Sequence, residues 1–410
     1  MITIGKPTVY SENEKAYLTA DISIPENAAL RYKETTSTLK NCSWRTEKDY
    51  PPKTWENGEA KLCFEVDKKY ADCLCTERSD AFVIAFLWYA IITGEDICFE
   101  VPMSERLYIG LTQKLIPALC SDGRRQIQLM GTVTSETLEC KGAVATGMSC
   151  GVDSFFTLRT HELTHITYYE CGHIFHLMGV VSDNISTEEY YQRAYEIADK
   201  KAASAADVAG QSGLEFVYVK SNLDKDFYRG GYIYRGMYVN LSCTLALQKL
   251  FKTYISSSSG HGVDLKTGLI VPTQNYENLL CDCCKTETLD YVSSDFTKRF
   301  EKIDRLSDDD LAAKYLDVCF NFKGKNCGEC YGCLKTILVL DLLGKLDKYS
   351  NVFDLEKYYS DRKKYIKILA DGARHRKIGS VIESWSDMVK YAKEHSGEPC
   401  DIILELEQQP

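Results

Sequence analysis

The residues with the most specific chemistry form a turn of small side chains, Ser149-Cys150-Gly151-Val152-Asp153-Ser154. The apolar run 143–146 before this turn predicts a buried parallel strand, and residues 155–158 after it predict the start of a helix. The free N–H groups and the dipole at a helix N-terminus favour an anion, and small residues let a ligand approach the backbone. The turn therefore predicts a phosphate site. The alternative is an ordinary strand-to-helix turn. It is not a Walker A loop, because no Gly-Lys-Ser/Thr follows.

A second motif provides metal ligands. Four thiols with short spacings can close a tetrahedron and leave no coordination position open, which is typical of a structural Zn²⁺ site. An iron–sulfur cluster is the main alternative, and four unrelated buried thiols are another. The motif has the spacing x7, x2 and x2 and consists of Cys319, Cys327, Cys330 and Cys333.

The loop resembles the SGGxDS loop of the PP-loop ATP pyrophosphatases, which split ATP between its α and β phosphates. The matching positions are Ser149, Gly151, Asp153 and Ser154. Cys150 stands where that family has its first glycine. If this position needs a positive φ, we expect the cysteine to cost on the order of 1 kcal/mol.

Together, the loop and the later cysteine motif resemble 7-cyano-7-deazaguanine synthase and its relatives, the QueC-like proteins, over about residues 141–343. The resemblance implies an α/β fold of the PP-loop (adenine nucleotide alpha hydrolase-like) type, in which a doubly wound parallel sheet carries a zinc-binding module. The long N-terminal region departs from the stand-alone synthases. It resembles longer QueC-like proteins found among bacterial antiphage defence components.

The resemblance also implies a reaction. ATP binds with its pyrophosphate in the loop, a carboxylate of the 7-carboxy-7-deazaguanine type attacks the α-phosphorus, and an amine displaces AMP from the acyl adenylate. The amine is ammonia, which gives an amide and then a nitrile, or an amino group of a partner protein docked on the N-terminal region. The backbone N–H groups of Ser149 to Ser154 would neutralise part of the phosphate charge. A Mg²⁺ ion held through Asp153 would neutralise the rest. Asp153 and Ser154 are the catalytic candidates.

Further candidates follow from the elements that must surround the loop. In doubly wound sheets the ligand lies at the carboxyl ends of the strands. We expect strands at 214–219 and 253–255, and small polar residues follow both. A plain turn and a solvated loop are the alternatives. The candidates at these two strand ends are Ser221, Asn222, Ser257 and Ser258.

Two other pairs complete the expected site. The resemblance places the adenine near residues 170–173, which makes Gly172 and His173 candidates for nucleotide binding. A structural histidine is the alternative. Arg299 and Lys302 are candidates for a basic clamp on the phosphates, with a solvated helix face as the alternative.

The chain is expected to divide into an N-terminal α/β adaptor or recognition domain (1–140), the ATP-binding domain with its zinc module (141–345) and a C-terminal helical extension (346–410). Residues 17–24 and 62–66 alternate between polar and apolar side chains and predict strands. Asp80 is expected to cap a helix from 81 to 92 that ends at Gly94, and Ser104 to cap the next helix, which runs to 118. A helix from 186 to about 209, stopped by Gly210, is expected in the second domain.

Composition limits the partners. The chain has 410 residues and a net charge of −10, which is unfavourable for binding nucleic acid through its phosphates. The chain shows no secretory signal, and its most apolar run, 81–92, is too short to span a bilayer, so we expect neither export nor a membrane. The eighteen cysteines are then expected to be thiols and metal ligands in the cytoplasm.

Two other functions remain open at this point. One is a PP-loop sulfurtransferase, in which one thiol carries a persulfide. The other is a nucleotide-binding scaffold without catalysis, suggested by Cys150 and by the extra domain. The candidate persulfide carriers are Cys150, Cys281, Cys283 and Cys284.

Overall fold

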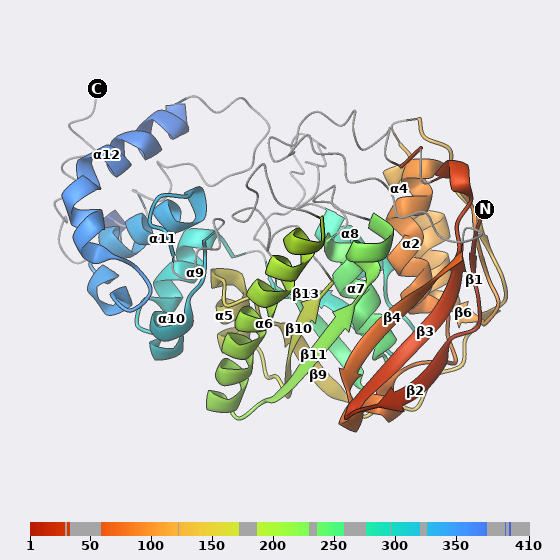
Figure 1. Ribbon diagram of the computed structural model, residues 1–410. Helices are drawn as coiled ribbons and strands as arrows, with labels where there is room; N and C mark the ends of the chain where they lie inside the picture. Colours follow the sequence, from red (N-terminus) through yellow and green to blue (C-terminus); the bar gives the residue numbers. More distant parts are fainter. Residues whose placement is uncertain are drawn as a thin grey trace.

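A computed structural model describes residues 1–28, 31–32, 59–121, 123–171, 187–228, 236–257, 276–295, 297–319, 326–374, 390 and 393–394. Within them, eleven strands form one sheet in the order β13-β12-β9-β10-β11-β4-β3-β1-β5-β7, with β2 paired to β3 (Figure 1). Strands β6 (Met103–Ser104) and β8 (Val133–Thr134) form a separate pair. The strands of the large sheet are β1 (Ile2–Ile4), β2 (Thr8–Glu12), β3 (Lys15–Ser23), β4 (Glu59–Asp67), β5 (Ile97–Phe99), β7 (Leu129–Met130), β9 (Ala143–Gly147), β10 (His165–Glu170), β11 (Glu215–Ser221), β12 (Phe251–Ser256) and β13 (Asp290–Ser293).

The half of the sheet from β13 to β11 is parallel throughout. Along the chain β9 is followed by β10 and β11, which extend the sheet to one side. The chain then returns, so that β12 and β13 lie on the other side of β9. The direction of winding therefore reverses between β9 and β12, and a crevice opens at such a point at the carboxyl ends of the strands.

The other half of the sheet joins the first through an antiparallel contact. Lys220 and Ser221 of β11 pair with Glu65 and Phe64 of β4, and β4 pairs along its full length with β3. One buried cluster of apolar side chains also extends from this half into the parallel half. Residues 1–28 and 59–134 thus share a sheet and a core with the strands that follow. The expected division at residue 140 stays a prediction.

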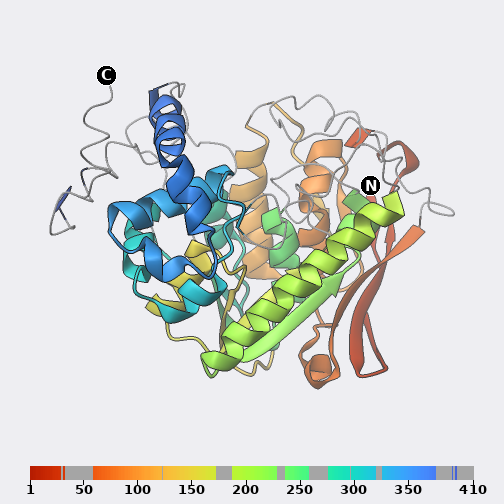
Figure 2. The same ribbon diagram turned by 60° about the vertical axis from the view of Figure 1, so that its left-hand side comes forward.

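Helices cover both faces of the parallel half. Val217 and Val219 of β11 face the buried cluster that includes α2, α7 and α8, whereas Phe216 and Tyr218 face the cluster that includes α5, α9 and α11. Figure 2 shows the long helix α6 lying along β11. The helices are α2 (Asp80–Thr93), α3 (Glu105–Gly110), α4 (Ile116–Leu119), α5 (Val152–Thr160), α6 (Thr187–Gln211), α7 (Gly236–Ala246), α8 (Tyr276–Cys283), α9 (Arg299–Leu306), α10 (Asp310–Tyr315), α11 (Tyr331–Leu342) and α12 (Leu355–Arg374).

Shorter helical turns connect several of these elements, and α9 to α12 gather at the end of the molecule away from the N-terminus (Figure 1). The expectation of a mixed α/β protein with a large, mostly parallel central sheet is confirmed. None of the helices among the described residues combines the length and the apolar character that a membrane crossing requires. The turns are η2 (Lys68–Cys73), η3 (Leu111–Leu115), η5 (Leu223–Tyr228) and η7 (Leu346–Tyr349).

The helix signals were partly confirmed. Gly94 ends α2 with φ of 68°, and the Ser104 hydroxyl accepts from the N–H of Leu107 as an N-cap. Asp80 is not the N-cap, because α2 begins at Asp80 itself after Ser79. Its carboxylate instead accepts the N–H of Ser104 (2.9 Å) and the amide of Gln248 (3.1 Å).

The C-terminal end of α6 also differs from the expected position. The helix continues past Gly210 to Gln211, and Gly213 takes the left-handed conformation with φ of 69°. The N–H of Leu214 then donates to the carbonyl of Ala209 (2.9 Å), which closes the helix end. The capping residue expected before α6, Ser186, lies outside the described residues.

Candidate functional site

The loop between β9 and α5 has a strained residue at its centre. Cys150 has φ of 59°, the left-handed region that a non-glycine residue adopts at a cost on the order of 1 kcal/mol. Cys150 is 3% exposed and packs among apolar side chains, and burial raises the pKa of its thiol to about 12. The positive φ thus occurs at the position where the SGGxDS pattern has its first glycine. A buried, protonated thiol is a poor nucleophile.

The N-terminus of α5 presents unused donors. Gly151 is the N-cap, its N–H donates to the Ser149 hydroxyl (3.2 Å), and its carbonyl accepts from Phe155 (3.1 Å). Within the described part of the chain, the N–H groups of residues 152–154 donate to no protein acceptor, as the first turn of a helix requires. This arrangement suits an anion, because the donors and the helix dipole point the same way.

The side chains of the loop divide into two kinds. Val152 and Ser154 are buried, and the Ser154 hydroxyl donates to the carbonyl of Gly151 (2.9 Å). Ser149 is exposed, and its hydroxyl lies 3.4 Å from that of Ser154. Ser154 therefore shapes the turn, whereas Ser149 faces solvent beside the free N–H groups.

The loop lies at the point where the winding of the sheet reverses. Thr146, in β9, donates from its hydroxyl to the carbonyl of Ile255 in β12 (2.7 Å) and lies 3.2 Å from the hydroxyl of Ser257. Ser257 is thus brought beside the strand that leads into the loop. Ser258 lies outside the described residues, as do Gly172 and His173.

Two cations converge on the loop carboxylate. Arg299 donates to Asp153, and the ammonium of Lys302 lies 3.3 Å from another oxygen of the same carboxylate. Lys302 is fully buried, with its ammonium 5.2 Å from the centre of the Phe156 ring. The two basic residues are therefore not on a solvated helix face. They form part of the loop's charge network.

One member of this network was missed from the sequence. Asp295 follows β13 and lies 3.3 Å from the Lys302 ammonium. It also accepts the N–H of Thr297 (2.7 Å), while its second carboxylate oxygen is buried without a hydrogen-bond partner in the described residues. The available signal was the short run Asp290 to Ser293, a strand that places the next residues at the carboxyl edge of the sheet.

Ser221 and Asn222 form hydrogen bonds within the protein and lie away from the phosphate loop. Both lie at the carboxyl end of β11, two strands away from β9. The Asn222 amide accepts the N–H of Cys63 (2.9 Å) and donates to Lys61 (2.9 Å) and Asp226 (2.8 Å). The Ser221 hydroxyl accepts the N–H of Leu223 (3.2 Å). Asn222 thus joins β11 to β4, and its hydrogen-bonding groups are occupied.

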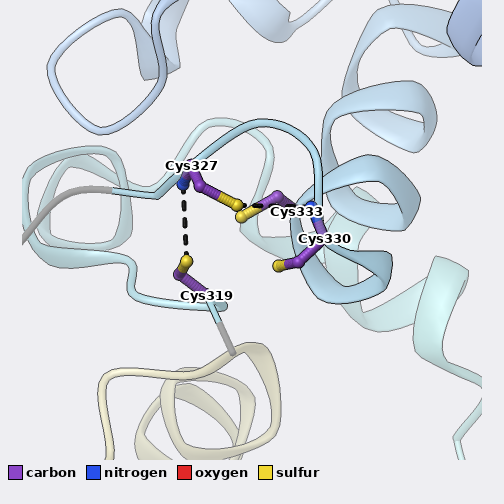
Figure 3. Close-up of side chains that lie close together, drawn as sticks. All are labelled: Cys319, Cys327, Cys330 and Cys333. Carbon is purple, nitrogen blue, oxygen red and sulfur yellow. Dashed lines mark hydrogen bonds between the residues drawn. The ribbon is translucent and has the colours of Figure 1, made fainter. Parts of the chain in front are cut away.

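The four cysteines of the second motif come together before and at the N-terminus of α11 (Figure 3). Their sulfur atoms all lie within 4.8 Å of one another. A tetrahedral Zn²⁺ with bonds of about 2.3 Å separates its sulfur ligands by about 3.8 Å, so a small contraction suffices. Cys327 accepts N–H groups from Glu329 (3.4 Å) and Cys330 (3.3 Å), and Gly328 supplies the positive φ of this turn. The cluster can bind a metal ion.

The cysteines at the C-terminal end of α8 and directly after it do not resemble such a centre. Cys281, Cys283 and Cys284 are buried, and burial raises the pKa of Cys284 well above its usual range. The backbone of Cys283 also packs closely against Gly110. Among the described residues, the four motif cysteines form the only group of three or more His, Cys, Asp or Glu side chains placed to hold a metal ion together.

Comparisons of the chain with models of protein families, with curated proteins and with solved structures found no match.

Proposed function

We propose that this protein is an ATP-dependent ligase of the QueC-like PP-loop type. It adenylates a carboxylate of the 7-carboxy-7-deazaguanine type with release of pyrophosphate, and an amine then displaces AMP. One observation carries the proposal: a helix N-terminus with free N–H donors lies at the reversal point of a parallel sheet, and two cations converge on its loop. The match of Ser149, Gly151, Asp153 and Ser154 to the PP-loop pattern supports it.

The charge network suits a leaving pyrophosphate. The N–H groups of residues 152–154 bind its oxygens, and the cations offset its charge as the bond to the α-phosphorus breaks. Lys302 is buried and held by two carboxylates, so it is a fixed charge. Arg299 is 23% exposed, and we expect it to turn from Asp153 to the phosphates.

The same residues fit a magnesium ion. Hard carboxylate oxygens are the protein ligands that Mg²⁺ prefers, and Asp153 and Asp295 both approach the Lys302 ammonium. The unpartnered oxygen of Asp295 provides a buried acceptor for a cation. Asp153 and Asp295 would therefore hold Mg²⁺, which screens the phosphate charge when bound.

The four-cysteine cluster is assigned to zinc with a structural role. Four sulfur ligands leave no position for a substrate, and Zn²⁺ favours a tetrahedral set of thiolates. Bound zinc requires reduced cysteines, which lose their protons to become thiolate ligands, and a reducing cytoplasm would keep them in this form.

The acceptor amine in this proposal is ammonia or an amino group of a partner protein docked on the N-terminal region. No role for nucleic acid or a membrane is proposed. The sulfurtransferase alternative is not favoured, because Cys150, Cys281, Cys283 and Cys284 are buried. The alternative of a nucleotide-binding scaffold is decided by the assay below.

The decisive experiment is mass spectrometry of the products formed from ATP, 7-carboxy-7-deazaguanine and either ammonia or a co-encoded protein. We expect AMP and pyrophosphate only when the carboxylate is present, and a nitrile, an amide or a modified protein as the second product. Asp153→Ala should abolish turnover. Asp308→Ala is the matched control, because Asp308 pairs at the surface with Lys345. Release of ADP, or tight ATP binding without any cleavage, would contradict the proposal.

A further inference from the structure

We propose that Asp317 couples the four-cysteine cluster to the phosphate loop, so that metal binding and nucleotide binding strengthen each other. The identity of the loop's ligand as a nucleotide rests on the proposed function. The link itself rests on the contacts of Asp317, which stands two positions before the first cysteine of the cluster.

Asp317 holds the loop by its backbone. Its N–H donates to the carbonyl of Cys150 (2.8 Å), the residue with a positive φ. The peptide bond is planar and trans, so fixing this carbonyl directs the N–H of Gly151 to the opposite side. That N–H meets the Ser149 hydroxyl (3.2 Å), immediately before the free donors of α5. The contact thus stabilises the strained conformation that opens the anion site.

Asp317 holds the cluster by its side chain. One carboxylate oxygen accepts the N–H of Cys319 (3.2 Å), and the other pairs with the ammonium of Lys201 in α6 (2.7 Å). Cys319 in turn accepts the N–H of Cys327 through its sulfur (3.4 Å). A continuous series of hydrogen bonds therefore leads from the cluster to the loop.

The buried side-chain amide of Asn326 ties the segment before Cys327 to the backbone on both sides of Asp317. Asn326 accepts the N–H of Val318 (2.9 Å) and donates to the carbonyls of Leu316 (2.8 Å) and Val352 (3.0 Å). Asn326 directly precedes Cys327 and forms hydrogen bonds with the residues on either side of Asp317. A metal that joins Cys319 to Cys327 would thus restrict the backbone of residues 316–319, and through it the carbonyl contact on Cys150.

Coupling between two sites is reciprocal and typically amounts to about 5- to 150-fold in affinity. We expect the metal-loaded full-length protein to bind ATP at least about fivefold more tightly than the chelated protein. We expect ATP to slow the transfer of zinc to a chelating dye by a similar factor. Metal removal should also increase hydrogen exchange in peptides covering residues 148–152 and 315–319.

Asp317→Ala keeps the backbone N–H but removes the contact with Cys319. With full metal content, it should bind ATP at least about fivefold more weakly and lose the effect of ATP on zinc release. Lys201→Met is the matched control, since it removes the ion pair and leaves both hydrogen bonds of Asp317. It should retain most of the coupling.

The outcomes separate the two proposals. If metal-loaded Asp317→Ala binds ATP as the unmodified protein does and ATP still slows its zinc release, the assignment of the coupling to Asp317 is refuted. If chelation of the metal leaves the hydrogen exchange of residues 148–152 unchanged, the structural link between cluster and loop is refuted. This result does not depend on whether the loop binds a nucleotide. If the metal-loaded protein binds no ATP but chelation still exposes the loop, the proposed function fails and the link stands.

Discussion

Lys302→Met tests the charge network most directly. The substitution keeps an apolar side chain against Phe156 and removes the ammonium that lies 3.3 Å from both Asp153 and Asp295. At an effective dielectric constant of about 20, each contact corresponds to about 5 kcal/mol of attraction, most of which is offset by the desolvation of the buried charge.

Removing one partner of a buried ion pair costs about 3–5 kcal/mol, because the other charge is left uncompensated. Asp153 keeps Arg299, and both carboxylates are about one-fifth exposed (21% and 19%). We therefore expect a loss near the lower limit, about 3 kcal/mol in the free energy of unfolding, measured by urea denaturation.

Two controls make this result interpretable. Lys298→Met, one residue before the same helix, removes an exposed ammonium and should cost less than about 1 kcal/mol. The double variant Lys302→Met with Asp295→Asn should recover more than about 1 kcal/mol relative to Lys302→Met, because the uncompensated carboxylate is gone. The reasoning is refuted if Lys302→Met costs no more than Lys298→Met, or if Asp295→Asn gives no recovery.

Three further predictions concern other positions. Burial raises the pKa of Asp80 from 3.8 to about 6, so its protonated form favours the fold: that stability is complete below about pH 4 and is lost as the pH rises through about 6. The stability of Asp80→Asn relative to the unmodified protein should therefore increase by about 2–3 kcal/mol from pH 4 to pH 8 in urea titrations, and a constant difference would contradict this. Asn222→Ala should lower the free energy of unfolding by about 1–3 kcal/mol, since it leaves groups of β4 unpaired, while the dissociation constant for ATP stays unchanged; a weaker ATP affinity with normal stability would instead indicate a ligand contact. Cys333→Ser should reduce metal content from one ion per chain to none and lower the melting temperature, whereas Cys98→Ser, outside the cluster, should change neither.

Much of the local structure could be predicted from residue patterns. The alternation in residues 17–24 predicted β3, and Gly94 and Ser104 predicted a helix end and a helix start. The strand, turn and helix around Ser149 to Ser154 were predicted for the same reason: small residues and helix-start signals act over a few positions. Asp80 failed as a cap because its carboxylate is used by distant residues, Ser104 and Gln248.

The residue types and their spacing by themselves predicted the four-cysteine cluster and the strand-to-helix turn. Three of the four cysteines lie within seven positions, so a short turn is enough to bring their sulfur atoms together. The first turn of a helix has free N–H donors wherever the helix begins. Only the tertiary structure decided what surrounds them. Asp295 reaches Lys302 and Asp317 reaches Cys150 because separate elements pack against each other. Asn222 bonds to Cys63 and Lys61 because β4 pairs beside β11. The contacts of Asp317 with Cys150 and of Asn222 with β4 join residues far apart in the chain and depend on the whole sheet order, which no local pattern specifies.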